Sequence, residues 1–227
     1  MKQGIVSKRR SVHLWVVLYL VLAVLILCSG CSPQPRADLV FLNGAEPETL
    51  DPALITGQPE GRVANALFEG LLTFDQSGKP QPGMAESWTV SEDGRIYTFT
   101  LREGLTWSDG TPLTARDFVE SWRRTLDPAT ASEYAYQLHY IKNARAFNEG
   151  KSADFSQVGV SAPDEQTLRV ELENPTPFFA DLCAFVTLLP VPLHVIREHG
   201  DDWIKPGRLV SNGAYVLESW RLNDRIR

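Results

Sequence analysis

The residues able to do acid, base or metal chemistry are few and poorly grouped in this sequence of 227 residues. His194 and His199 are five positions apart, whereas helical zinc ligands lie three or four apart so that both rings share one face. This spacing favours a solvated helix end over a metal site. Glu92 and Asp93 suggest the acid and base of a glycosidase, but they precede Gly94 in a turn-like segment, where acidic residues are expected. We expect no metal and no cofactor.

No side chain has the surroundings of a nucleophile. Cys183 lies between Leu182 and Ala184 in an apolar run, which favours a small buried side chain over a reactive thiol. No Ser or Lys lies in a nucleophile elbow, and no glycine-rich loop fits a phosphate group. The sequence therefore gives no support for catalysis, and a secreted hydrolase that uses carboxylates is kept as the alternative from the enzyme class.

The first 31 residues have the pattern of a secretion signal. Lys2 and three more basic residues precede an almost unbroken apolar run from Val12 to Leu27, which is 16 residues long. A transmembrane helix needs about 20 apolar residues, so this run favours a cleaved signal peptide over a membrane anchor.

The end of that run resembles a bacterial lipoprotein signal, because small residues stand directly before Cys31. The resemblance implies that Cys31 becomes the lipidated first residue, so that the protein is anchored in the periplasm or at the cell surface without spanning the membrane. Cys28 stands where such signals have an aliphatic residue. The alternative is an ordinary signal peptide that is cut nearby. Residues 32–37 follow as a polar tether with two prolines.

The charge balance argues against nucleic acid as a partner. Four of the 22 Lys and Arg lie in residues 1–31, which leaves 18 against 28 Asp and Glu in the rest of the chain. No basic stripe for phosphate contacts is visible in that acidic remainder.

The segment from Arg95 to Val119 has the clearest structural pattern. Apolar and polar residues alternate from Ile96 to Leu101, which predicts a strand. Asp109 and Gly110 predict a turn, and Thr114 can cap a helix that runs from Ala115 to Leu126.

Other elements follow from similar patterns. Strands are expected at residues 39–42, 71–74, 85–90, 159–160, 167–172 and 214–220, and helices over about 60–70, over 134–144, from residue 178, and over 193–199. Hairpins are expected around residues 91–94, 161–166 and 222–225. This order predicts a mixed α/β (α+β) fold without the regular alternation of a doubly wound sheet. The sequence stops two residues after the last of these turns, which cuts the partner of the preceding strand short, so we expect a longer protein.

Several segments in this order resemble the large solute-binding lipoproteins of oligopeptide and dipeptide ABC importers, solute-binding protein family 5. The matching segments are residues 43–52, 67–71, 82–88, 97–112, 117–122 and 211–215. The run Trp107-Ser108-Asp109-Gly110-Thr111 lies in the signature region of that family.

The resemblance implies a periplasmic-binding-protein-like type II lobe that contains an inserted α/β subdomain. Residues 38–82 and 207–227 would form the first lobe, and residues 83–206 the insertion. The second lobe of the family is missing from this sequence.

The resemblance also implies the ligand and the residues that touch it. An oligopeptide would pair its backbone with Thr56, Gly57 and Gln58, and Tyr134 would line the cleft. The second lobe of the family supplies an acidic residue for the peptide amino terminus, so we expect the 227-residue chain alone to bind weakly. The partners would be the ABC permease and the membrane, and the protein would be a monomer. Nickel, haem or sugar ligands and a non-functional truncated remnant are the alternatives within this reading.

Overall fold

The computed structural model describes residues 19, 37 and 39–227. The expected signal peptide (1–31), most of the tether (32–37) and the lipidation site Cys31 lie outside the described residues. Residues up to Leu42 and residues from Asn43 to Arg227 form separate units, and every element named below belongs to the second. No helix in the described part of the chain is long and apolar enough to cross a bilayer.

The strand expected at residues 39–42 is wrong. These four residues have no regular structure, and each side chain is between 59% and 92% exposed. A short strand is stable only when it pairs with another, and no strand among the described residues pairs with this segment.

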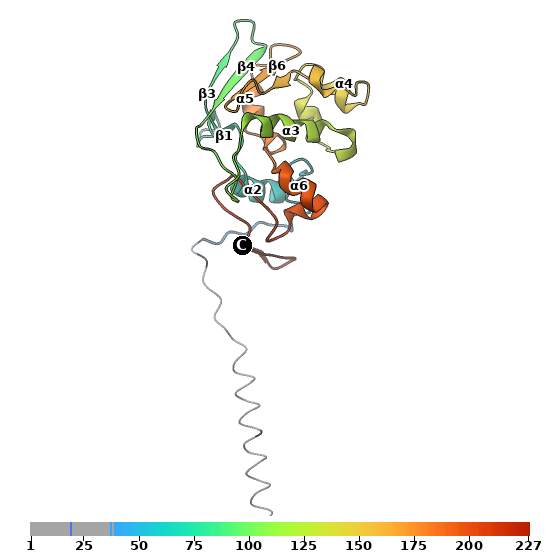
Figure 1. Ribbon diagram of the computed structural model, residues 1–227. Coiled ribbons are helices and arrows are strands. Elements are labelled where there is room, and N and C mark those ends of the chain that lie inside the picture. The colour runs from blue at the N-terminus through green and yellow to red at the C-terminus, as the bar shows by residue number, and fades with distance from the viewer. Residues whose placement is uncertain (1–18, 20–36, 38) are drawn as a thin grey trace, which may run out of the picture. The chain divides into compact units, whose positions relative to one another are not determined.

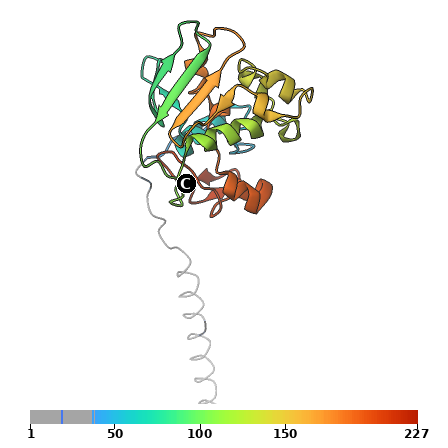
Figure 2. The ribbon, with the colours of Figure 1, turned by 45° about the horizontal axis from the view of Figure 1, so that its top comes forward.

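A four-stranded antiparallel sheet is the largest element of the structure. Its strands are β3 (Ala85–Val90), β4 (Ile96–Leu101), β5 (Val160–Ser161) and β6 (Thr167–Glu171), in the order β3-β4-β6-β5 (Figure 2). Phe99 of β4 faces Trp88 of β3 on one side and Leu168 of β6 on the other. The hairpins expected around residues 91–94 and 161–166 are confirmed.

Helix α3 (Ala115–Leu126) packs against β5 and β6, and it has the bounds expected from the sequence (Figures 1 and 2). At the start of α3, the Asp117 carboxylate accepts a 2.7 Å hydrogen bond from the Thr114 N–H, which satisfies one of the free donors of a helix end. Phe118, Trp122 and Leu126 are four residues apart and fully buried. They form the apolar stripe that packs into the core.

The helix expected over residues 134–144 is wrong as a continuous element. The segment is divided into a 3-10 turn η2 (Ala135–Leu138) and a short helix α4 (Ala144–Asn148). Asn143 between them has φ of 60°, a conformation that ends a right-handed helix. Its side chain donates a 2.7 Å hydrogen bond to the Gln157 carbonyl, so a tertiary contact holds the break.

Residues 58–82 contain α2 (Gln58–Leu67), β1 (Leu72–Phe74) and β2 (Pro80–Pro82). Helix α2 begins two residues before the expected start and ends three residues before Gly70. Strand β2 was not expected, because its two prolines are typical of turns. Proline is nevertheless tolerated in an edge strand, and β2 pairs only with β1.

The remaining elements are short. They are η1 (Pro128–Thr130), η3 (Phe155–Gln157), α5 (Phe179–Leu182), η4 (Val186–Leu188), α6 (Leu193–His199), η5 (Gly200–Ile204), β7 (Trp220–Arg221) and β8 (Arg225–Ile226). The β7–β8 hairpin and α6 agree with the sequence pattern.

The strand expected over residues 214–220 is wrong except at Trp220. The Gly213 N–H donates to the Leu67 carbonyl at 2.8 Å, and the Tyr215 N–H donates to the Ala66 carbonyl at 3.2 Å. The last carbonyls of a helix have no partners within the helix. This segment therefore follows the end of α2 and does not join a sheet.

Candidate functional site

A tight turn at Asp51 sets the path of the segment expected to bind a ligand. The Asp51 carbonyl accepts from the Leu54 N–H at 2.9 Å, and its carboxylate accepts from the Ala53 N–H at 3.0 Å. Both bonds are typical of an Asx-type turn. Ile55 follows and is 2% exposed, so it fixes the chain to the core one residue before Thr56.

Thr56 and Gly57 present free backbone donors at the surface. Gly57 has φ of −112° and ψ of 161°, which is an extended conformation. Among the described residues, neither the Thr56 N–H nor the Gly57 N–H has a recorded hydrogen-bond partner. Extended backbone with free groups is the feature that lets a second chain add as a strand.

Gln58 differs from the expectation of a three-residue extended segment. It is the first residue of α2, and Pro59 follows it at a position where a missing N–H costs a helix nothing. The Gln58 side chain accepts a 3.3 Å hydrogen bond from Arg62 on the next turn. The extended part of the segment therefore ends at Gly57.

Glycine at position 57 is required by a buried carboxylate. A Cβ atom there would lie 2.3 Å from Oε2 of Glu60, which is 6% exposed. The other oxygen of Glu60 accepts a 3.0 Å hydrogen bond from the Glu48 N–H and thereby holds the carboxylate in place. The close packing of Glu60 leaves no room for a side chain on Gly57.

Tyr134 lies beside this segment although 78 residues separate it from Thr56. Its hydroxyl donates to the Thr56 carbonyl at 3.4 Å. Its ring meets Phe185 edge-on with centroids 6.1 Å apart, and Tyr136 lies at 5.8 Å. The structure thus brings Thr56, Gly57 and Tyr134 together at one surface with two further aromatic rings.

Neither Phe185 nor Tyr136 was identified from the sequence. Phe185 lies in the same apolar run that indicated a buried Cys183, and an apolar run does not show which member borders a site. Tyr136 lies two residues after Tyr134, so the only available signal was its proximity in the sequence.

Cys183, the candidate nucleophile among the described residues, is buried. Cys183 is 1% exposed, and burial, with the nearby charge of Asp181, raises the pKa of its thiol well above the ordinary value. This confirms the interpretation of Cys183 as a small buried side chain.

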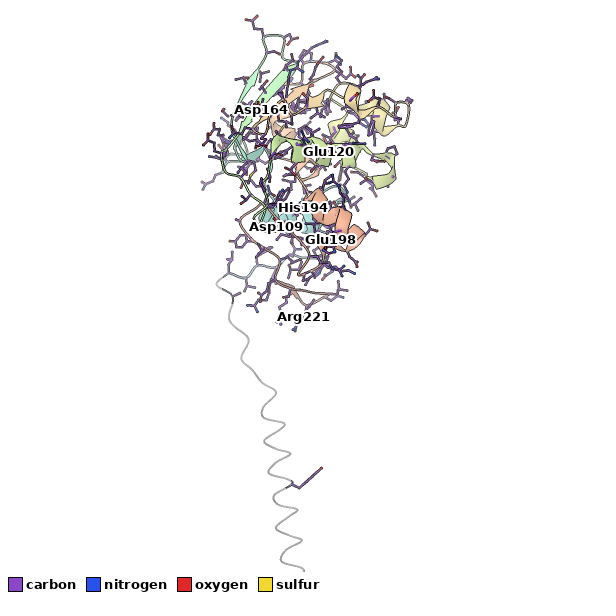
Figure 3. All side chains as sticks on the ribbon, viewed as in Figure 1. Asp109, Glu120, Asp164, His194, Glu198 and Arg221 are labelled. Carbon is purple, nitrogen blue, oxygen red and sulfur yellow. The ribbon has the colours of Figure 1, made fainter. Side chains whose placement is uncertain are left out.

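His194 is paired with Asp109 and not with His199. Its Nε2 lies 2.8 Å from the Asp109 carboxylate (Figure 3). Burial raises the pKa of Asp109, but hydrogen bonds from Thr111 and His194 outweigh it and bring the pKa below its ordinary value. The described residues contain no group of three or more acidic, His or Cys side chains able to hold a metal ion.

A separate cavity of about 410 Å³ lies between the end of α2, β1 and the Gly213 segment. Its lining comprises Asn65, Phe68, Glu69, Gly70, Leu72, Thr73, Phe74, Ala184, Leu189, Gly213 and Ala214. Burial raises the pKa of Glu69, and the charge of Arg102 opposes this effect. The lining includes neither Thr56 nor Tyr134.

A family model and individual relatives point to the same protein family. Residues 79–227 match the model described as bacterial extracellular solute-binding proteins, family 5 Middle. The periplasmic oligopeptide-binding protein OppA of Escherichia coli is 45% identical over 200 residues, which are 87% of this chain and 36% of that protein. The probable deoxycholate-binding periplasmic protein YgiS of Escherichia coli is 46% identical over 194 residues, which are 85% of this chain and 36% of that protein.

Solved structures agree with the sequence matches. The crystal structure of Haemophilus influenzae OppA in complex with the peptide RPPGFSPFR is similar with a TM-score of 0.78 and 45% identity. That similarity covers 81% of this chain and 36% of the OppA chain. The chain therefore spans little more than a third of the length of these relatives.

Proposed function

Because the chain belongs to family 5 of the bacterial extracellular solute-binding proteins, we propose that it captures oligopeptides outside the cytoplasm and delivers them to the permease of an ABC importer. Similar proteins carry the names of periplasmic oligopeptide-binding and murein peptide-binding proteins. In this proposal the chain is a monomer that performs no catalysis of its own.

The observation that carries the proposal is the pair of free backbone N–H groups at Thr56 and Gly57. Pairing with a peptide main chain gives affinity without reading the side chains, which suits a protein that takes many sequences. The Tyr134 hydroxyl donates a hydrogen bond to the Thr56 carbonyl. The rings of Tyr134 and Phe185 offer an apolar surface to a ligand side chain.

The proposal includes the route and the anchor. Residues 1–31 would direct export, Cys31 would carry the lipid, and residues 32–37 would hold the folded part off the membrane surface. The proposal also includes the predicted division of the chain. Residues 38–82 and 207–227 would form the first lobe, and residues 83–206 would form the insertion.

A bile acid is the second candidate ligand, because the 46% identical relative is named as probably deoxycholate-binding. The aromatic rings of Tyr134, Tyr136 and Phe185 suit an apolar ring system. A steroid, however, has no row of N–H and C=O groups to pair with Thr56 and Gly57. The two candidates therefore differ in which atoms of the site they use.

Nuclear magnetic resonance of the ¹⁵N-labelled chain can separate these candidates even when binding is weak. We expect a pool of tri- to pentapeptides to shift the amide signals of Thr56 and Gly57. The matched control is the same pool with N-methylated backbones, which keeps every side chain, while its methyl groups crowd the strand edge and keep the peptide carbonyls away from the Thr56 and Gly57 N–H groups. The control should produce shifts at least about tenfold weaker at equal concentration, since it loses the ladder hydrogen bonds.

Two outcomes would overturn the proposal. Equal shifts with the methylated pool would show that backbone pairing is not used. Shifts around Tyr134 with deoxycholate, together with none from peptides, would favour the bile-acid ligand.

A further inference from the structure

Asp51 is a buried carboxylate held by groups from three separate parts of the chain. Arg124 of α3 donates to both of its oxygens, at 2.9 Å and 2.5 Å. The Trp203 indole N–H lies 3.4 Å from Oδ2, and the Ala53 N–H donates to Oδ1 at 3.0 Å. The side chains of Asp51 and Arg124 are 4% and 19% exposed.

This geometry ties the turn before Thr56 to helix α3. The Asp51 oxygen that accepts from Ala53, inside the turn, also accepts from Arg124. A planar guanidinium that donates to both carboxylate oxygens fixes the orientation of the carboxylate as well as its position. The turn residues 51–54 are therefore held by a helix that begins 64 residues after Asp51 in the sequence.

The same helix leads to the other side of the candidate site. Arg124 lies in the last turn of α3, and Asp127 caps the helix end by donating to the Arg123 and Arg124 carbonyls. The short turn η1 then carries the chain towards Tyr134. Arg124 thus joins the turn before Thr56 to the helix from which the chain continues to Tyr134.

We propose that Arg124 is the positioning residue of the peptide-binding surface, acting through Asp51 to hold the Thr56–Gly57 backbone in reach of Tyr134. The proposal rests on the function inferred above for Thr56 and Gly57. A buried ion pair is not in itself a good source of stability, so its effect is better sought in local geometry than in overall unfolding.

Arg123 supplies a matched control on the same helix. It is 54% exposed in its side chain, it lies 3.7 Å from Glu120, and its guanidinium lies over the Phe155 ring. Arg123→Lys makes the same substitution at the neighbouring position, without touching Asp51.

Amide hydrogen exchange tests the positioning without any ligand. Arg124→Lys keeps the charge but loses the paired hydrogen bonds to both Asp51 oxygens. In this variant we expect the Ala53 and Leu54 amides to exchange about tenfold faster than in the native chain. Exchange in β4 and β6 should not change, and Arg123→Lys should leave the Ala53 and Leu54 rates unaltered. Unchanged rates in Arg124→Lys, or equal acceleration throughout the sheet, would overturn the proposal.

The double variant Asp51→Asn with Arg124→Met covers the case in which a lone buried charge prevents folding. It leaves no uncompensated charge, and it should fold with the turn amides still accelerated. A folded double variant with native exchange at Ala53 and Leu54 would contradict the positioning role.

Peptide binding then distinguishes the two proposals. If the native chain shows no peptide-dependent shifts while Arg124→Lys still loosens the turn, the function fails and the positioning stands. If peptides shift Thr56 and Gly57 equally in the native chain and in Arg124→Lys, the function stands and the positioning role fails.

Discussion

Replacement of Ser121 by Ala tests how much one buried hydrogen bond contributes to the packing of α3. Ser121 is 1% exposed, and its Oγ accepts from the Val191 N–H at 2.9 Å while donating to the Asp117 carbonyl at 2.6 Å. Removing the oxygen changes the side-chain volume little. It leaves the Val191 N–H buried and without the acceptor that the structure gives it.

The expected cost follows from that orphaned donor. An unsatisfied buried donor costs about 1–3 kcal/mol, and Val191 is 2% exposed, so water cannot readily replace the lost oxygen. We expect Ser121→Ala to lower the free energy of unfolding by about 2 kcal/mol.

Thr125→Val is the matched control one helical turn away. Thr125 is 3% exposed, and its hydroxyl donates to the Ser121 carbonyl at 3.1 Å. That carbonyl already accepts a helical N–H, so no group is orphaned, and the expected loss is below about 1 kcal/mol. Equilibrium urea unfolding followed by tryptophan fluorescence measures both variants. Equal losses in the two variants, or no loss in Ser121→Ala, would refute the reasoning.

Three further predictions concern other parts of the chain. Gly213→Ala should destabilise the fold by about 1–3 kcal/mol, because a Cβ there would lie 2.7–2.8 Å from the backbone at the end of α2. Gly61→Ala, inside α2, is the control: its Cβ would meet no atom within 4 Å besides the backbone of its own helix, so it should stabilise the fold by up to about 1 kcal/mol. Thermal unfolding of both variants checks the contrast. With the other two cysteines replaced by Ser, Cys183 should react with a thiol reagent only at the rate of unfolding, since it is buried with a raised thiol pKa; rapid labelling of the native chain would contradict this. The hydrogen bond from the Gln166 N–H lowers the pKa of Asp164 in the folded state, so its stabilisation is present above the unfolded pKa near 3.8 and is lost as the pH falls through the folded value. In urea unfolding between pH 5 and pH 2, the free energy of unfolding should fall less steeply with falling pH in Asp164→Asn than in the native chain.

The elements with local signals were predictable from the sequence. Helix α3 was predicted with its observed bounds, because the capping residues Thr114 and Asp117 and the apolar spacing lie within one short segment. The β3–β4 and β5–β6 hairpins were predictable for the same reason, since alternation and turn residues are adjacent in the sequence.

The errors arose where a distant partner decided the local structure. Residues 214–217 form an apolar run that is typical of a strand, but the Leu67 and Ala66 carbonyls at the end of α2 accept from the Gly213 and Tyr215 N–H groups. Asn143 breaks an otherwise helical pattern because its side chain bonds to Gln157. Neither partner can be identified from the sequence near the affected residue.

The candidate site was predictable only in part. The resemblance to a family indicated Thr56, Gly57, Gln58 and Tyr134; the structure places Tyr134 against Thr56 and makes Gln58 the first residue of α2. Arg124 had no such signal, because an Arg in a helix is ordinary until its contact with Asp51, 73 residues away, is known.

The order of strands in the sheet affects how the protein can be made. Strand β4 pairs with β3 across a short turn, but its other edge pairs with β6, where Phe99 faces Leu168. A growing chain therefore carries an open apolar edge on β4 until about 70 more residues have been synthesised. Such an edge is a site for mispairing with other chains, so the interval before β6 emerges is when a chaperone that binds extended segments would have its greatest effect.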